Sequence, residues 1–217
     1  MTAPFEQAYH DALAHHRAGR LAEADQLYAR AVALKPDLVE AHNNRGAIRQ
    51  MAGDWAAALA CYDAAVRFRP DYAEALANRG NVLIQLRRYD EAMASFDAAL
   101  QITPGRASAL NGRAGVLFKL KRFGEALAAY GRLRAADPKN PYALGGMLIA
   151  AMNLCDWATV ERITPETSPE TIEAWDSIQH LNFVLALEEK FNFQLSPEEM
   201  EQIRSVGEAS KMVESKL

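Results

Sequence analysis

The sequence predicts an all-α protein, most of which is a stack of short helix pairs. Proline recurs every 34 residues, and small and aromatic residues precede each proline at fixed distances. Such a period is typical of a repeat made of two helices and their turns. Half of the 217 residues are hydrophobic, which suits a folded chain and is too high for a disordered one.

Four independent columns share the 34-residue period. They are Pro36, Pro70, Pro104 and Pro138; Ala24, Ala58, Ala92 and Ala126; Tyr28, Tyr62, Phe96 and Tyr130; and Ala31, Ala65, Ala99 and Leu133. The columns divide the chain into units 5–38, 39–72, 73–106 and 107–140, with a degenerate fifth unit over 141–160.

Each element of a unit has a physical reason. Alanine in the second helix lets the first helix pack close, and the aromatic residue four positions later lies on the same face and fills the gap toward the next unit. Proline ends the second helix, because it lacks an N–H and clashes with the preceding turn. Gly46 and Gly80 are the small residues expected in the first helix. The turns between helices are expected at Gly19-Arg20, Gly53-Asp54, Arg87-Arg88 and Lys121-Arg122.

The columns resemble the Ala, aromatic, Ala and Pro positions of the tetratricopeptide repeat family. The resemblance implies a right-handed superhelix whose concave face, lined by the first helices, binds an extended peptide of a partner protein. Asparagine offers a donor and an acceptor, so a column of asparagines can bracket a peptide backbone. The alternative is that some of them cap or bridge adjacent helices. The expected peptide-binding residues are Asn43, Asn44, Asn78, Asn81 and Asn111.

Two features resemble a narrower group, the O-linked N-acetylglucosamine transferases. Asn44 and Asn78 resemble the asparagine ladder of their repeat arm, and the run 153–157 resembles the end of that arm in bacterial relatives. Too few residues follow Trp157 for a catalytic domain, so glycosyl transfer is not expected. The Lys/Arg pattern that clamps a chaperone's terminal carboxylate is not reproduced, because Tyr9 and Leu13 occupy those positions.

The charge changes sign near residue 160. Residues 1–160 carry 19 basic and 16 acidic side chains, whereas residues 161–217 carry 5 and 12, which makes the net charges +3 and −7. Neither part has the Lys/Arg excess typical of nucleic-acid binding. We therefore expect two domains, a repeat domain over 1–160 and a separate acidic segment over 161–217.

The acidic segment resembles an acyl carrier protein that lacks its first helix. The resemblance is carried by Asp176-Ser177-Ile178, the run 186–191, the helix start Pro197-Glu198-Glu199, and 205–207. It implies that Ser177 carries 4′-phosphopantetheine, a covalent cofactor that holds an acyl thioester, and that basic-surfaced biosynthetic enzymes are partners. The alternatives are that Ser177 is an ordinary residue at a helix start, and that the segment only caps the apolar end of the repeats.

No other chemistry is expected. The five histidines lack metal-ligand spacing, and no glycine-rich phosphate loop or nucleophile motif is present. The longest uncharged run, 140–155, is shorter than the roughly 20 apolar residues of a membrane helix, and no signal peptide is visible. Cys61 and Cys155 have no paired spacing. We expect a cytoplasmic binding protein, not an enzyme, with no membrane or metal.

Overall fold

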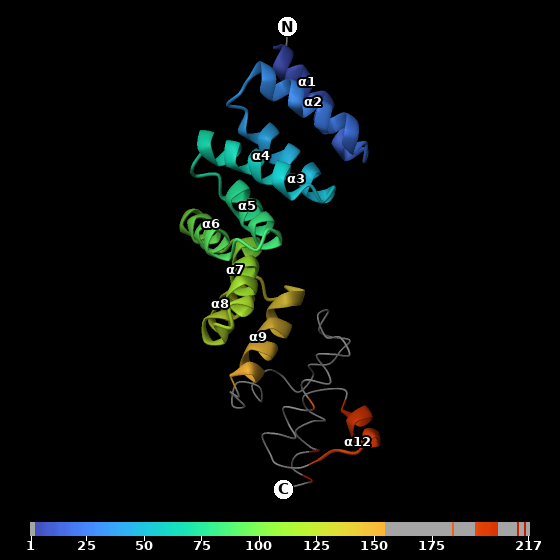
Figure 1. Ribbon diagram of the computed structural model, residues 1–217, viewed down its shortest axis with the longest axis vertical. Helices are drawn as coiled ribbons and strands as arrows, with labels where there is room; N and C mark the ends of the chain where they lie inside the picture. Colours follow the sequence, from blue (N-terminus) through green and yellow to red (C-terminus); the bar gives the residue numbers. More distant parts are fainter. Residues whose placement is uncertain (1–2, 155–183, 185–193, 204–211, 213–214, 216–217) are drawn as a thin grey trace. The chain divides into compact units, whose positions relative to one another are not determined.

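The computed structural model describes residues 3–154, 184, 194–203, 212 and 215 (Figure 1). The chain divides into two compact units, Met1–Gly112 and Arg113–Leu217. The division falls inside helix α7 (Ala107–Lys119). Every regular element in the described part of the chain is a helix, as the sequence predicts.

Unit 1 is a row of helix pairs. Each first helix packs against the second helix that follows it, and α2 packs on α3 and α4 on α5, so consecutive pairs are joined (Figure 1). The helices are α1 (Pro4–Arg17), α2 (Leu21–Leu34), α3 (Val39–Met51), α4 (Trp55–Phe68), α5 (Ala73–Gln85) and α6 (Tyr89–Ile102).

The predicted turns between helices are confirmed, and one backbone position makes each of them. Gly19 and Gly53 have φ values of 73° and 74°, and Arg87 and Lys121 adopt the same left-handed conformation at 58° and 57°. Glycine reaches this region without strain, whereas a side chain makes it unfavourable. The second helices end two residues before each periodic proline, at Leu34, Phe68, Ile102 and Ala136.

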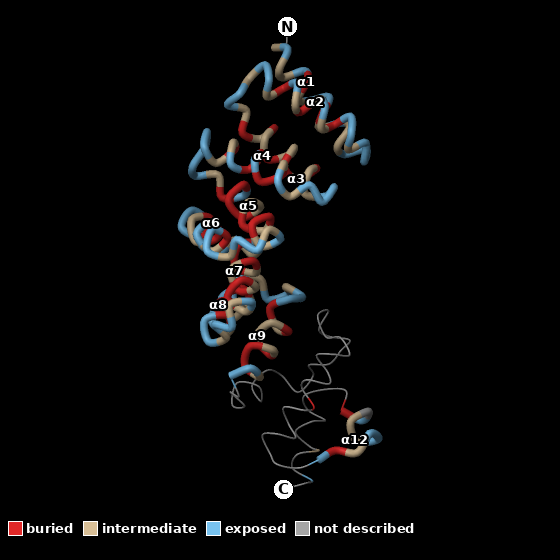
Figure 2. The backbone as a smooth tube through the Cα atoms, viewed as in Figure 1, coloured by how far each residue is buried: buried red, intermediate tan, exposed pale blue. Residues whose placement is uncertain are grey.

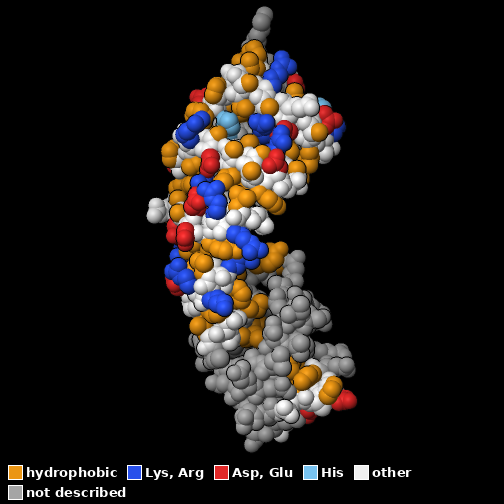
Figure 3. Space-filling view, viewed as in Figure 1, with side chains coloured by type: hydrophobic (Ala, Val, Ile, Leu, Met, Phe, Trp, Pro, Cys, Tyr) orange, Lys and Arg blue, Asp and Glu red, His pale blue; other side chains and the backbone are white. Residues whose placement is uncertain are grey.

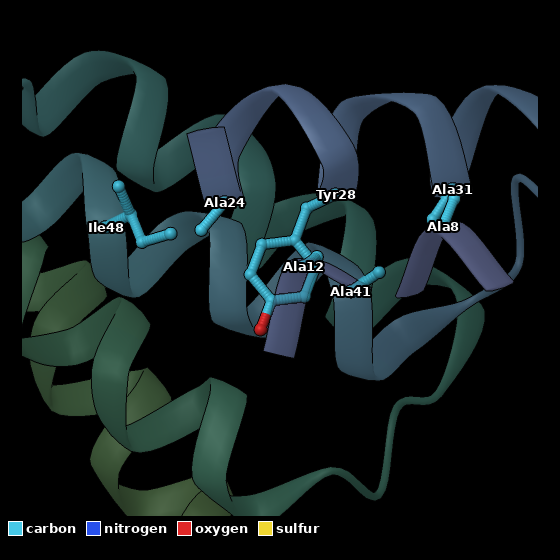
Figure 4. Packing of buried hydrophobic residues seen from close by; sticks show 7 residues of the cluster. All are labelled: Ala8, Ala12, Ala24, Tyr28, Ala31, Ala41 and Ile48. Carbon is cyan, nitrogen blue, oxygen red and sulfur yellow. The ribbon is translucent and has the colours of Figure 1, made fainter. Parts of the chain in front are cut away.

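The core of unit 1 is built from the periodic alanines and aromatics. Tyr28, Tyr62 and Phe96 are fully buried, and Tyr28 lies among small side chains such as Ala12 and Ala24 (Figures 2 and 4). Small side chains on both helices allow the backbones to approach, and the ring fills the remaining space. The predicted roles of the alanine and aromatic columns agree with this packing.

Glycines of the first helices lie directly against these rings. A Cβ placed on Gly46 would lie 2.7 Å from the Tyr62 ring, and one on Gly80 would lie 2.6 Å from the Phe96 ring. A Cβ on Gly112, in the next repeat, would also reach Phe96, at 2.3 Å. The aromatic ring therefore packs both within its own repeat and toward the next one, as the spacing predicts.

Unit 2 contains the fourth helix pair and the start of the fifth repeat. Helix α8 (Phe123–Ala136) packs against α9 (Pro141–Asn153), and a Cβ on Gly146 would lie 2.4 Å from the Tyr130 ring. The degenerate repeat thus begins at the expected residue and keeps the ring-on-glycine contact.

One helix of the acidic segment is described, α12 (Pro197–Gln202). Its start is as predicted: the Ser196 side chain accepts from the Glu199 N–H, the Glu199 carboxylate accepts from the Ser196 N–H, and Pro197 occupies the first turn. The predicted domain boundary at 160/161, the run 153–157 beyond Leu154, and Ser177 lie outside the described residues. The acyl-carrier resemblance therefore remains a prediction.

Candidate binding face

The first helices of unit 1 bring a set of polar side chains together. We define the first-helix face as the side chains of Tyr9 on α1, Asn43 and Asn44 on α3, and Glu74 and Asn78 on α5. Asn44 and Asn78 are 34 residues apart, as are the positions of Tyr9 and Asn43, so the face follows the repeat.

A chain of hydrogen bonds joins α3 to α5 on this face. The Asn78 Nδ2 donates to the Asn43 Oδ1 at 3.1 Å, and the Asn43 Nδ2 donates to the Glu74 Oε1 at 2.9 Å. Asn43 is only 2% exposed. Of the two interpretations of the sequence, peptide binding or helix bridging, Asn43 therefore has the geometry of a bridge.

A second set of contacts surrounds Tyr28 at the junction of the first two repeats. The Asn44 Nδ2 donates to the Tyr28 hydroxyl at 3.3 Å, and the His16 Nδ1 lies 3.3 Å from the same hydroxyl. The rings of Tyr9 and Tyr28 are 5.9 Å apart. Burial raises the pKa of Tyr28 to about 12, and the Asn44 hydrogen bond acts in the opposite direction. The pKa of Tyr9 is also raised, first by burial and then by Glu40.

Asn81 on α5 and Asn111 on α7 are half-buried. Within the part of the chain that the structure describes, neither side chain makes a hydrogen bond. The five predicted asparagines therefore fall into three kinds of environment: one bridge, two amides with one end engaged, and two unengaged amides. Their role in peptide binding stays a prediction.

Ion pairs join neighbouring repeats beside this face, and they were not predicted from the sequence. The Asp25 carboxylate accepts from the Arg45 Nε at 3.0 Å and the Arg49 Nε at 3.1 Å. The Arg79 Nε donates to Asp63 at 2.6 Å, one repeat further on. Arg45 and Arg79 are 34 residues apart, so the repeat spacing could have revealed these pairs. Figure 3 shows acidic and basic side chains interspersed over unit 1.

The glutamates at the start of the first helices differ in what neutralises them. Glu6 accepts from the Ala3 N–H at its own helix start, and Glu40 forms an ion pair with Arg69 at 2.8 Å. Glu74 forms no ion pair among the described residues and accepts only from Asn43 there. Its negative charge is therefore left for another group.

The described residues contain no group of three or more His, Cys, Asp or Glu side chains that could hold a metal ion. None of the described helices combines the length and the apolar composition needed to cross a bilayer.

Comparison with known proteins supports the repeat assignment. Two tetratricopeptide repeat family models match the chain, over residues 50–107 and 83–152. A search of curated proteins found no match. The matches lie on the repeats and give no support to the glycosyltransferase or acyl-carrier resemblance.

Several solved structures have a similar fold. The Pseudomonas aeruginosa pilF protein is 16% identical with a TM-score of 0.70, over 87% of this chain and 84% of its own. YrrB, described as a TPR protein with an unusual peptide-binding site, is 16% identical with a TM-score of 0.65, over 84% and 90%. The first TPR of Spaghetti (RPAP3), bound to the HSP90 peptide SRMEEVD, is 20% identical with a TM-score of 0.52, over 54% and 93%. At these identities the likeness shows the fold.

Proposed function

The chain is a tetratricopeptide repeat (TPR) protein, and on that premise we propose that it is an interaction scaffold that holds an extended segment of a partner protein on the first-helix face of unit 1. TPR proteins generally mediate protein–protein or peptide binding and are typically not enzymes. Two proteins of similar fold have a described peptide-binding site or a bound peptide.

One observation carries the proposal: Asn44 and Asn78 occupy the same position in successive repeats, and each amide has one end tied within the protein. Asn44 donates to Tyr28 and Asn78 donates to Asn43, which holds each amide in place. The Oδ1 of each then remains for a ligand, because no described residue donates to it. Two fixed acceptors one repeat apart suit an extended peptide backbone, which presents N–H groups at regular intervals.

Substitution of both asparagines tests this proposal. The variant Asn44→Ala/Asn78→Ala is compared with Gln26→Ala, which removes a half-buried amide from α2, away from the first-helix face. Binding to an array of short synthetic peptides in extended sequences is measured by fluorescence anisotropy. We expect about tenfold weaker binding in the double variant, from roughly 1 kcal/mol per hydrogen bond, and unchanged binding in the control. Equal binding by the two variants would refute the proposal.

The sequence favours a second function for residues 161–217. Asp176-Ser177-Ile178 matches the carrier motif, so we propose Ser177 as the attachment point of 4′-phosphopantetheine from coenzyme A. The serine oxygen bonds to the pantetheine phosphate, the pyrophosphate bond breaks, and 3′,5′-ADP leaves. Intact-mass analysis after incubation with coenzyme A and a phosphopantetheinyl transferase tests this. A gain of one phosphopantetheine that Ser177→Ala abolishes supports it, and no gain contradicts it.

The third proposal is a purely structural segment. If residues 161–217 cover the apolar end of the repeats, their deletion causes aggregation, whereas a monodisperse truncated protein rules out this role. We also propose the cytoplasm as the compartment, because Cys61 is a buried free thiol and free thiols are usual in reducing compartments. Cell fractionation tests the location.

A further inference from the structure

The hydrogen bonds of Asn43 have a fixed direction because of the group at one end. A carboxylate can only accept, so Glu74 requires the Nδ2 of Asn43 to point toward it. The Oδ1 of Asn43 then points toward Asn78 and must receive its Nδ2. One carboxylate thereby orients two amides in series.

We infer that Asn43 is a positioning residue, which does not touch the partner and holds Glu74 and Asn78 so that the face presents hydrogen-bond acceptors to it. The inference rests on the proposed peptide binding and adds the chemistry of the partner. Asn43 is 2% exposed and both ends of its amide are engaged, so it has no atom to offer a ligand. Glu74 is exposed and Asn78 is half-buried, so both are reachable.

The acceptor character of this part of the face follows from the orientation. The Asn78 Nδ2 is engaged by Asn43, which leaves its Oδ1 as the acceptor that faces a ligand. Glu74 adds a carboxylate with one oxygen bonded to Asn43 and no ion pair among the described residues, unlike Glu40 with Arg69. The surroundings are consistent: burial and then Glu74 raise the pKa of Tyr72, to about 12.

The partner segment therefore presents donors at this point. A backbone N–H suits the Asn78 Oδ1, and a Lys or Arg side chain suits the Glu74 carboxylate, because charge-assisted hydrogen bonds are the stronger ones. An acidic side chain placed there would face the Glu74 charge with no described cation in an ion pair with it. We expect a preference for Lys or Arg over Glu of about tenfold at the peptide position next to Glu74.

The first test examines the free full-length protein by NMR of side-chain amides. In Asn43→Leu the Asn78 amide loses its acceptor, and its amide protons are expected to shift and to exchange faster with water. In Asn43→Asp/Glu74→Gln the new carboxylate at position 43 still accepts from Asn78, and the new amide at position 74 can donate to it. Slow exchange of the Asn78 amide is expected to return. Asn78 signals that stay unchanged in Asn43→Leu would overturn the positioning role.

The second test measures specificity with short synthetic peptides that carry Lys, Arg, norleucine or Glu at one central position. The wild type is expected to prefer Lys and Arg, Asn43→Leu to lose most of that preference, and Glu74→Gln to lose its salt dependence. A loss of stability in Asn43→Leu with the Lys-to-Glu binding ratio unchanged would leave Asn43 only a structural role. A preference for Glu overturns the inferred partner chemistry. Absence of all peptide binding by the wild type overturns the proposed function, while the NMR result still decides the positioning role.

Discussion

The contact between Gly80 and the Phe96 ring makes an alanine at position 80 unfavourable. A Cβ there would lie 2.6 Å, 2.7 Å and 2.9 Å from the Cε1, Cζ and Cδ1 of Phe96. Carbon atoms in contact are normally about 3.5–4.0 Å apart, so ring or helix would have to move by about 1 Å. The ring is fully buried and also lies against Gly112, which restricts its escape on the other side.

The expected magnitude combines two opposing terms. Overpacking a tight core costs about 1–3 kcal/mol, whereas replacing glycine by alanine inside a helix stabilises by about 0.5–1 kcal/mol. Overpacking therefore prevails, and Gly80→Ala should lower the free energy of unfolding by about 1–2 kcal/mol. The size of the first term depends on the fixed position of Phe96.

Urea unfolding followed by circular dichroism measures this effect, and a matched control has the opposite sign. Gly131 lies in α8, where an added Cβ would have no atom within 4 Å, so Gly131→Ala should stabilise by about 0.5–1 kcal/mol. The pair Gly80→Ala/Phe96→Leu should cost less than the sum of its two single changes, because a smaller side chain relieves the clash. Stabilisation by Gly80→Ala equal to that of Gly131→Ala would refute the reasoning.

Three further predictions concern the turns, the tyrosines and the ion pairs. Arg87→Gly should stabilise by about 0.5–1 kcal/mol in urea unfolding, because Arg87 has a positive φ that glycine adopts without strain; destabilisation contradicts this. The raised pKa of Tyr28 contributes stability that is present below pH 10 and is lost as the pH rises toward about 12, so wild type should lose about 1–2 kcal/mol relative to Tyr28→Phe over that interval; parallel pH curves disprove it. Asp25→Ala should cost about 1–3 kcal/mol, because the carboxylate is 13% exposed and engages two arginines, whereas Asp63→Ala, at a half-exposed pair, should cost less than about 1 kcal/mol; similar thermal midpoints for the two variants would count against this account.

The helix pairs and their turns could be predicted because each depends on local chemistry repeated at one period. Proline cannot continue a helix, and alanine beside an aromatic residue indicates a close helix contact, so these residues locate the helices without knowledge of any contact. The turn at Arg87 shows how much the period adds. Arginine is not a residue that favours positive φ, yet its position in the repeat, equivalent to Gly53, placed the turn there.

The candidate site could be predicted only as a set of residues. Asn43 and Asn44 are adjacent and chemically identical, and the sequence treats both as peptide-binding residues. Adjacent residues on a helix point about 100° apart. One of them is buried between α3 and α5, where it joins Asn78 to Glu74, while the other reaches Tyr28 on the preceding repeat. The carboxylate of Glu74 could not be singled out from the sequence, because the glutamates at positions 6 and 40 occupy the same place in their repeats.

By itself the sequence determined that this protein is a TPR protein, where its repeats begin and end, and which residues fill its core. These properties follow from spacing along one chain. The tertiary structure decided which asparagines are engaged, in which direction their amides point, and which glutamate keeps an unpaired charge among the described residues. Those properties depend on atoms 16 to 35 residues apart in sequence that meet only when one helix pair packs on the next.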